Sequence, residues 1–249
     1  MSLIVAVSSL SGGQGKSTTS LLLALELAAR GRSVLVVDLD PQGDLSAWLE
    51  ADPLQPGALE LLLKKGEAAE CIQETAIENL SVIGAGDRLD SAQLYLSGRT
   101  APALVLRQRL APVVKDYDYL ILDTPPARSL LGVTALGAAQ QVVISAEASG
   151  KGIASLDRTR ELLMEMRDDE ATEAQLVAVI PFRLKVIGRN IVGKCAAALE
   201  VFQEELGDLL LPSLLESEQI AAAATNVRRL EGALAEPIVT LADRLEGKE

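Results

Sequence analysis

Residues Ser8–Thr18 have the sequence SSLSGGQGKST, and this stretch decides the fold of the chain. An apolar run over Leu3–Val7 precedes it, and apolar residues at helical spacing follow it from Leu21 onward. A strand, a glycine-rich loop and a helix in this order form the context of a phosphate-binding loop. Glycines let successive backbone N–H groups point into one concavity, and the helix N-terminus adds a partial positive charge. The stretch therefore predicts a site for nucleotide phosphates.

Two side chains of this loop carry chemistry. Lys16 can reach the β- and γ-phosphates, and the Ser17 hydroxyl can coordinate Mg²⁺. The common pattern has a glycine five residues before Gly15, where this chain has Leu10. The predicted nucleotide-contacting residues of the loop are Ser11, Gly12, Gly13, Gln14, Gly15, Lys16, Ser17 and Thr18.

Two further apolar runs end in aspartates. Ser33–Asp38 leads into Asp40, and Tyr119–Asp123 leads into a Thr-Pro-Pro segment. Carboxyl ends of parallel strands meet at the sheet edge where ligands bind, so these carboxylates are expected beside the phosphate loop. A run that ends in an aspartate has the Walker B form, whose carboxylate holds Mg²⁺, usually through water. Asp123 is therefore a predicted metal residue.

The three motifs together resemble the deviant Walker A ATPases of the ParA/MinD type. That family's loop has the pattern Lys-Gly-Gly-x-Gly-Lys-Ser/Thr, and Ser11 stands here in place of its first, signature lysine. The block Asp38–Asp44 resembles the family's Asp-x-Asp-Pro-Gln-Gly-Asn signature, with Asp44 where asparagine is usual. The serine at position 11 also makes the loop similar to that of the carboxysome-positioning, McdA-type branch.

The resemblance assigns roles to several residues. It implies ATP and Mg²⁺ as cofactors, catalysis by Lys16 and Asp40, and a water-positioning role for Asp40. It places Asp38 in the Mg²⁺ shell with Ser17 and Asp123. It also implies that two loops contact the adenine, with the residues Pro181, Phe182, Arg183 and Pro212.

Without the signature lysine, either this protein lacks stabilisation of the phosphates across a dimer, or another cation supplies it. Lys151 follows the expected strand Gln141–Ala146, whose carboxyl end faces the nucleotide, and it begins a helix. A lysine at a helix start works against the helix dipole, so a specific role is expected. We predict that Lys151 is catalytic and replaces the signature lysine across a dimer. A solvated loop lysine is the alternative.

Strand–helix alternation along all 249 residues, without linker or repeat, predicts one doubly wound α/β domain with a mostly parallel sheet flanked by helices. Outside the motifs, we expect a helical piece over Glu67–Glu74, a strand over Val177–Ile180, a helix over Asn190–Leu206 and a short strand over Leu209–Leu211. No signal peptide or membrane span is expected. The chain has no histidine and two cysteines without paired spacing, so carboxylates, lysines, hydroxyls and a metal must carry the chemistry.

The net charge of −12 argues against attraction of the whole surface to DNA or anionic lipid. The window Val177–Leu199, however, contains basic residues and no acidic ones, which is typical of a phosphate-contacting face. The alternative to a DNA-binding face is that these are ordinary surface lysines and arginines. The predicted DNA-binding residues are Arg183, Lys185, Arg189, Lys194, Arg228 and Arg229.

The resemblance implies an ATP-switched positioning protein of the cytoplasm. Such a protein forms an ATP-dependent homodimer, coats the nucleoid through non-specific double-stranded DNA, and moves a carboxysome, plasmid or chromosome. An adaptor of the McdB or ParB type stimulates hydrolysis. Two alternatives remain: a MinD-like membrane-associated ATPase, which would need a basic amphipathic C-terminal helix, and a metabolic P-loop ATPase acting on a small molecule.

Overall fold

The computed structural model describes residues 2–188 and 190–248, and within them the chain forms a seven-stranded sheet in the order β3-β4-β2-β5-β1-β6-β7. All neighbouring strands run parallel except β3, which lies antiparallel at one edge. The strands are β1 (Leu3–Ser8), β2 (Val34–Asp38), β3 (Gln73–Glu74), β4 (Leu80–Ile83), β5 (Tyr119–Asp123), β6 (Gln141–Glu147) and β7 (Gln175–Phe182). The predicted doubly wound, mostly parallel fold is confirmed.

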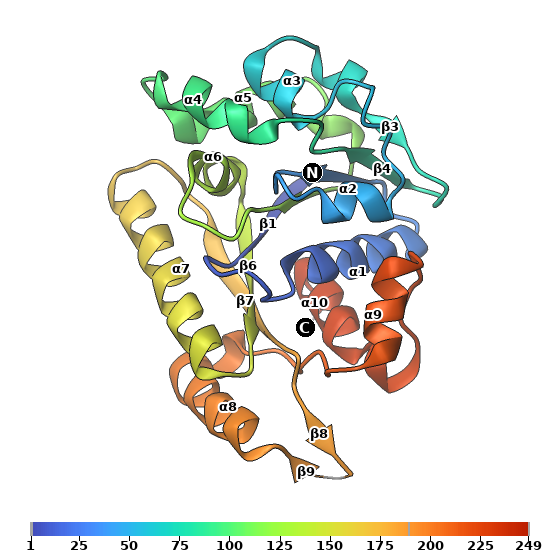
Figure 1. Ribbon diagram of the computed structural model, residues 1–249, viewed down its shortest axis with the longest axis vertical. Coiled ribbons are helices and arrows are strands. Elements are labelled where there is room, and N and C mark those ends of the chain that lie inside the picture. The colour runs from blue at the N-terminus through green and yellow to red at the C-terminus, as the bar shows by residue number, and fades with distance from the viewer. Residues whose placement is uncertain (1, 189, 249) are drawn as a thin grey trace.

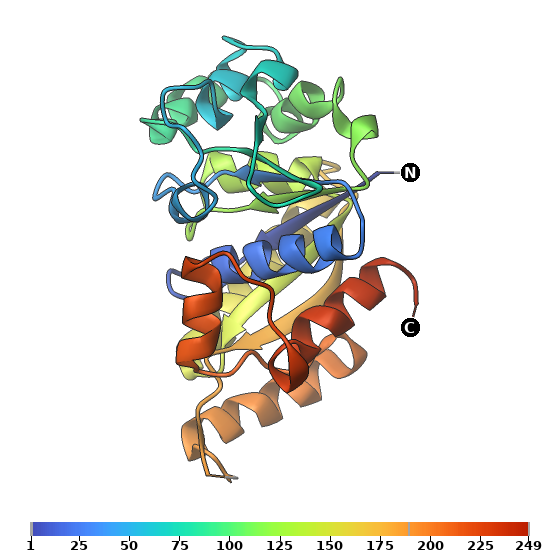
Figure 2. The same cartoon turned by 90° about the vertical axis from the view of Figure 1, so that its right-hand side faces the viewer.

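Helices cover both faces of this sheet (Figure 1). Figure 1 shows α7 and α8 on one side and α1, α9 and α10 on the other, and Figure 2 gives the view at right angles. The helices are α1 (Lys16–Ala29), α2 (Asp44–Trp48), α3 (Ala58–Leu63), α4 (Ala92–Ser97), α5 (Val105–Leu110), α6 (Leu130–Ala138), α7 (Gly150–Asp168), α8 (Gly193–Leu206), α9 (Glu218–Thr225) and α10 (Glu236–Leu245).

The strands separate two hydrophobic cores because alternate residues point to opposite faces. In β1, Ile4 and Ala6 join the core under α3 to α8, whereas Val5 and Val7 join the core under α1, α2, α9 and α10. Strands β2 and β5 are buried along their whole length, as expected for central parallel strands covered on both faces. The apolar runs that precede the aspartates are therefore core strands, and they carry those aspartates to the same sheet edge.

Local structure departs from the sequence expectations in two segments. Glu67–Glu74 forms a single 3₁₀ turn over Ala68–Cys71 and then β3, because this stretch pairs with β4. The helix expected from Asn190 begins only at Gly193.

Before that helix the chain forms a hairpin of β8 (Val186–Ile187) and β9 (Asn190–Ile191), which Figure 2 shows extending below the body. The β-branched residues and Gly188, at φ +63°, favour this turn.

The structure also differs from the two strands that the sequence predicts near the β7 edge of the sheet. Strand β7 is longer than Val177–Ile180, since its pairing with β6 extends from Gln175 to Phe182. Leu209–Leu211 does not form a strand; a single bridge joins Leu210 to Val179, after a 3₁₀ turn over Gly207–Leu209.

A buried carboxylate ties the C-terminal end of α1 to the end of the chain. Glu26 is 2% exposed and accepts hydrogen bonds from Arg30 at 2.8 Å and from Arg229 at 2.5 Å. Arg30 also donates to Asp243 at 2.6 Å and to Glu246 at 2.8 Å, so its guanidinium joins α1 to α10. Burial alone would raise the pKa of Glu26, but the bonds from Arg229 and Arg30 lower it.

Hydrogen bonds from basic side chains also lower the pKa of Glu246, and the shift is large. Its side chain is 2% exposed, and hydrogen bonds from Lys248, Arg30 and Arg32 lower its pKa to about 2 although burial opposes this. A carboxylate whose pKa is lowered on folding contributes stability above its ordinary pKa of 4.5, and that contribution is lost as the pH falls through the lowered value.

We expect Arg30→Met to lower the free energy of unfolding at neutral pH by about 2 kcal/mol, because the buried carboxylates of Glu26 and Glu246 then each lose one of their positively charged partners. Because the pKa of Glu246 is 4.5 when unfolded and about 2 when folded, the difference from wild type should shrink as the pH falls from about 5 toward 2. Urea unfolding of both proteins at neutral pH and in this acidic range measures the difference in free energy of unfolding. The exposed pair of Arg128 and Glu165 gives the control: Arg128→Met should cost less than about 0.5 kcal/mol. Equal losses for both variants would contradict the assignment.

Candidate nucleotide site

The phosphate loop, the loop after β2 and the loop after β5 meet at the carboxyl edge of the sheet. A cleft of about 320 Å³ lies there. Its lining consists of Gly12, Gly13, Gln14, Gly15, Lys16, Ser17, Thr18, Asp40, Gln42, Asp44, Trp48, Pro126, Phe182 and Arg183. The structure therefore brings together most of the predicted nucleotide residues. A larger cavity of about 770 Å³ lies at the opposite edge, between the loops that enter β5 and β6, and includes none of them.

Glycine is required at two positions of the loop by backbone conformation. Gly13 and Gly15 have φ values of +79° and +84°, in the left-handed region. A Cβ on Gly15 would also lie 2.5 Å from the ring of Phe182. Phe182 thus packs against the phosphate loop, and the guanidinium of Arg183 lies 5.4 Å from the centre of its ring.

Gln14 anchors the loop to β6. Its backbone carbonyl accepts a hydrogen bond from Ser145 Oγ at 2.5 Å, and its side-chain oxygen accepts one from the Glu147 amide at 2.8 Å. Gln14 is fully buried, so its predicted nucleotide contact is restricted to the backbone. The sequence pattern gave no sign of this anchoring role, because the partners lie more than 130 residues away.

Asp38 and Asp123 are fully buried neighbours, paired in the register of β2 and β5. Asp38 accepts hydrogen bonds from the Ser46 amide at 2.9 Å and the Ser46 hydroxyl at 2.6 Å. Burial raises the pKa of both aspartates, and their mutual repulsion raises that of Asp123 further.

Lys16 is 5% exposed beside these carboxylates. Burial lowers its pKa, while the charges of Asp123 and Asp40 act in the opposite direction. Asp40 is 9% exposed and its Oδ1 accepts a hydrogen bond from the Gln42 amide at 3.0 Å, so this carboxylate is fixed at the wall of the cleft.

The residues present fit a bound Mg²⁺. Asp123 Oδ1 accepts a hydrogen bond from Ser20 at 3.0 Å, whereas its Oδ2 is buried without a partner. The nearby Ser17 side chain acts to lower the pKa of this carboxyl group, against the larger effect of burial. A buried, unpartnered carboxylate oxygen beside a serine hydroxyl is a hard oxygen donor set, which suits Mg²⁺ held with phosphate oxygens and water. Among the described residues no cluster of three His, Cys, Asp or Glu side chains could hold a metal by itself.

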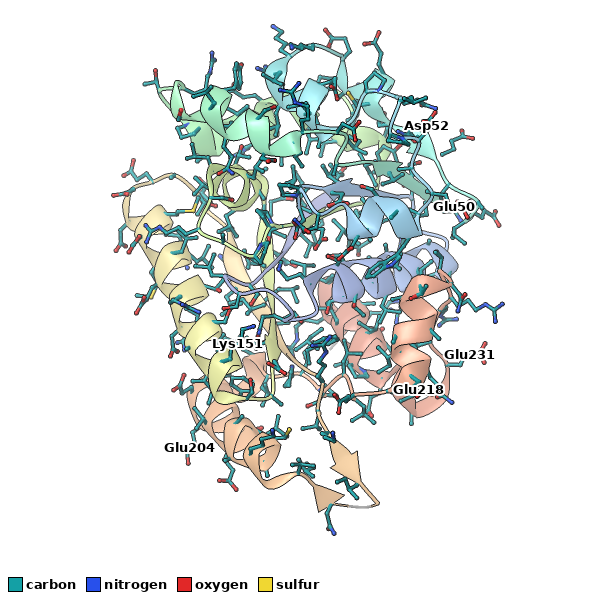
Figure 3. All side chains as sticks on the ribbon, viewed as in Figure 1. Glu50, Asp52, Lys151, Glu204, Glu218 and Glu231 are labelled. Atoms are coloured by element: carbon teal, nitrogen blue, oxygen red, sulfur yellow. The ribbon has the colours of Figure 1, made fainter. Side chains whose placement is uncertain are left out.

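Lys151 lies against the phosphate loop at the first turn of α7, as Figure 3 shows. Its Nζ donates a hydrogen bond to the Gly12 carbonyl at 2.8 Å, and the side chain is exposed. Another side chain of α7, Arg158, donates to Ser11 Oγ at 2.9 Å. The sequence analysis missed Arg158, although its helical spacing of seven from Lys151 could have indicated it.

The remaining predicted nucleotide residues lie away from the cleft. Pro181 is the last but one residue of β7, and Pro212 follows the 3₁₀ turn after α8; neither lines the cleft. Four residues that were not predicted as site residues, Gln42, Asp44, Trp48 and Pro126, do line it. Pro126 belongs to the Thr-Pro-Pro segment, which was a usable signal, whereas Trp48 is brought there only by the packing of α2.

The predicted DNA-binding residues are dispersed and differently engaged. Arg183 lines the nucleotide cleft, and Lys185 lies 3.4 Å from Glu216 in an ion pair. Arg229 is bonded to the buried Glu26. Lys194 and Arg228 are exposed. Arg189 lies outside the described residues.

This glycine loop, with its lysine and paired aspartates at the carboxyl edge of a doubly wound sheet, defines a P-loop NTPase. Residues 2–173 match the family model described as an AAA domain. The chain is 44% identical over 224 residues to maintenance of carboxysome distribution protein A of Synechococcus elongatus, covering 89% of this chain and 88% of that protein. It is 33% identical over 189 residues to the sporulation initiation inhibitor protein Soj of Bacillus subtilis, covering 74% and 75%.

A solved structure agrees with these sequence relatives. An ATP complex of a Cyanothece McdA variant with one aspartate replaced by alanine matches with a TM-score of 0.94 and 35% identity, covering 98% of this chain and 96% of that one. The chain belongs to the ParA-like family of P-loop ATPases. No helix within residues 2–188 and 190–248 is long and apolar enough to cross a membrane.

We expect Gly15→Ala to weaken ATP binding at least ~100-fold, because it combines backbone strain with a clash against Phe182 at the loop itself. Gly31→Ala is the matched control: Gly31 also has positive φ, at +77°, but a Cβ there would meet nothing within 4 Å. Both variants should lose about 1 kcal/mol of stability from the positive φ. Fluorescent-nucleotide titration and urea unfolding separate the two effects, and equal ATP affinities would contradict the assigned loop geometry.

Proposed function

We propose that this chain is an ATP-switched positioning ATPase that distributes carboxysomes. The observation that carries the proposal is the combination of Ser11 in place of the signature lysine with Lys151 against the same loop. The 44% identity to a maintenance of carboxysome distribution protein over most of both chains supports the same cargo. In this proposal ATP closes a homodimer, the dimer binds the nucleoid, and hydrolysis releases it.

ATP and Mg²⁺ are the cofactors of the site. The loop amides and Lys16 hold the phosphates, and Ser17 with Asp123, supported by Asp38, holds the metal. Bound Mg²⁺ neutralises charge on the β- and γ-phosphates. Asp40, which lines the cleft, accepts a hydrogen bond from the attacking water and orients it. Unaided turnover is expected to be slow, because the chain has no histidine to act as a general base.

Lys151 takes the place of the missing signature lysine. Its exposed ammonium already contacts the loop through the Gly12 carbonyl. A second subunit stacked over this face would bring its phosphates to that ammonium, which then neutralises charge in the way of an arginine finger. The hydrogen bond within the subunit is compatible with this role, because a lysine side chain can exchange one oxygen acceptor for another.

DNA binding in the proposed dimer uses the exposed basic residues beyond β7. Lys194 at the start of α8 and Arg228 after α9 make no ion pair within the described residues, so both charges are available to phosphates. Arg183, Lys185 and Arg229 contribute less, since each already has a partner or lines the cleft. Figure 3 shows Glu204 on α8 and Glu218 on α9, so the basic residues are interspersed with acidic ones and binding should be weak and salt-dependent.

An adaptor protein on the cargo completes the cycle by stimulating hydrolysis. In this proposal the protein acts in the cytoplasm, bound to the nucleoid in its ATP state. The alternatives are a membrane-associated positioning ATPase and a metabolic ATPase acting on a small molecule. The cysteines do not favour an iron–sulfur relative, since Cys71 and Cys195 are buried in separate clusters.

We expect retention on non-specific double-stranded DNA with ATP, and none with ADP or without nucleotide. Lys194→Glu combined with Arg228→Glu should abolish retention at moderate salt, because a dimer loses four phosphate contacts. Lys64→Glu combined with Lys65→Glu, directly after α3 and at the opposite end of the molecule from α8 (Figure 1), changes the net charge equally and should retain binding. Binding to anionic vesicles in place of DNA, or loss of DNA in both variants, would overturn this assignment.

We expect Lys151→Ala to reduce ATP-induced dimerisation and ATP hydrolysis at least ~100-fold, because the charge across the dimer is lost. Lys151→Arg should restore part of the activity. Light scattering with ATP and phosphate release measure the two effects. Lys115→Ala, at the opposite edge of the sheet, is the control. Unchanged dimerisation in Lys151→Ala would show that this lysine is only a solvated loop residue.

A further inference from the structure

One face of α7 carries polar side chains at the helical positions i, i+4, i+7 and i+8. These are Lys151, Ser155, Arg158 and Thr159, and all four contact the segment Ser9–Gly12, which connects β1 to the phosphate loop. Residues at this spacing lie on one side of a helix. The first half of the phosphate loop is thus supported along its length by a single helix.

The two inner contacts are buried. Ser155 Oγ lies 2.9 Å from Ser9 Oγ, and both side chains are fully buried. The Leu10 amide donates to Thr159 Oγ1 at 3.1 Å, while that hydroxyl donates to the Ser155 carbonyl at 2.6 Å. The threonine hydroxyl is therefore oriented to accept, and it satisfies a loop amide that would otherwise have no partner.

The two outer contacts are made by cations. Arg158 Nη2 donates to Ser11 Oγ at 2.9 Å, and its Nε donates to the Ala154 carbonyl one turn earlier at 3.0 Å. These two bonds fix the guanidinium over Ser11, which is only 8% exposed. Lys151 has a single bond, to the Gly12 carbonyl, and no second acceptor that would fix it.

The difference between the two cations separates their roles. If Lys151 leaves the Gly12 carbonyl to reach a phosphate, three of the four contacts of α7 with the loop remain. If Arg158 is absent, the Ser11 hydroxyl loses the only hydrogen-bond partner that it has within the described residues, beside the position where the loop turns toward the phosphates. A lysine at position 11 would also bring an ammonium against this guanidinium, which explains why a small neutral acceptor is compatible with arginine at position 158.

We infer that Arg158 is a positioning residue for nucleotide binding, which acts through Ser11 to hold the entry of the phosphate loop while Lys151 is free to exchange partners. This inference rests on the proposed ATP binding at the same site but not on dimer formation or DNA. Arg158 is not assigned a contact with the phosphates.

The test is titration of the full chain with a fluorescent ATP analogue and Mg²⁺, at protein concentrations where it is monomeric. Arg158→Ala should raise the Kd about tenfold, which corresponds to one charge-assisted hydrogen bond. Arg160→Ala, which removes a charge from the same helix where it pairs with Glu205, should change the Kd less than about twofold. A Kd for Arg158→Ala within the range of the Arg160→Ala control would overturn the inference.

A double-mutant cycle identifies the partner. Ser11→Ala should weaken ATP binding as much as Arg158→Ala, and the double variant should be no weaker than either. Arg158→Lys, which keeps one donor, should recover most of the affinity. Thermal unfolding without nucleotide should be unchanged in Arg158→Ala and Arg158→Lys, because Arg158 is exposed. Two results would overturn the positioning role of Arg158: losses of ATP affinity that add in the double variant, or a lowered melting temperature that accounts for the weaker binding.

The outcome is separable from that of the proposed function. Lys151→Ala should lose dimerisation, whereas Arg158→Ala should lose ATP affinity before any dimer forms. If the chain binds ATP but never DNA or a second subunit, the positioning of the loop by Arg158 is still measured by the same titration.

Discussion

The site depends on three buried charges at the carboxyl edge of the sheet. The parallel pairing of β2 with β5 places Asp38 next to Asp123, and the phosphate loop brings Lys16 beside them. Burial raises the pKa of the carboxyl groups and lowers that of the ammonium, so the charged form of each group is less favourable here than in water until an opposite charge arrives. Phosphates and Mg²⁺ supply those opposite charges, which makes the site an electrostatic complement to a magnesium nucleotide.

The phosphate loop is held from both sides of the sheet. On one side, α7 supports Ser9–Gly12 through hydrogen bonds, and Gln14 is tied to β6. On the other side, α1 continues from the loop and is joined at its far end to α10 through Arg30. This support favours phosphate binding, because the loop amides are already held in place and little conformational entropy is lost when the phosphates bind.

The charge distribution sets a constraint on the DNA binding that belongs to the proposed function of this acidic chain. Several arginines and lysines that the sequence presents as a basic group have structural partners: Arg229 compensates Glu26, and Lys185 pairs with Glu216. The charges left for phosphates are few and dispersed. Attraction to DNA in the proposed function would then need two subunits acting together, which links DNA binding to the nucleotide state.

The sequence by itself determined the central strands of the sheet, its carboxyl edge and the glycine loop and aspartates of the candidate site, because each depends on a local pattern: an apolar run, a glycine loop or an aspartate at a strand end. The tertiary structure alone decided the short edge strand β3, the β8–β9 hairpin, and the pairings of Arg158 with Ser11 and of Arg229 with Glu26. These pairings join residues 147 and 203 positions apart. No local pattern encodes them, since they arise only when packing of whole helices on the sheet brings distant side chains within hydrogen-bonding distance.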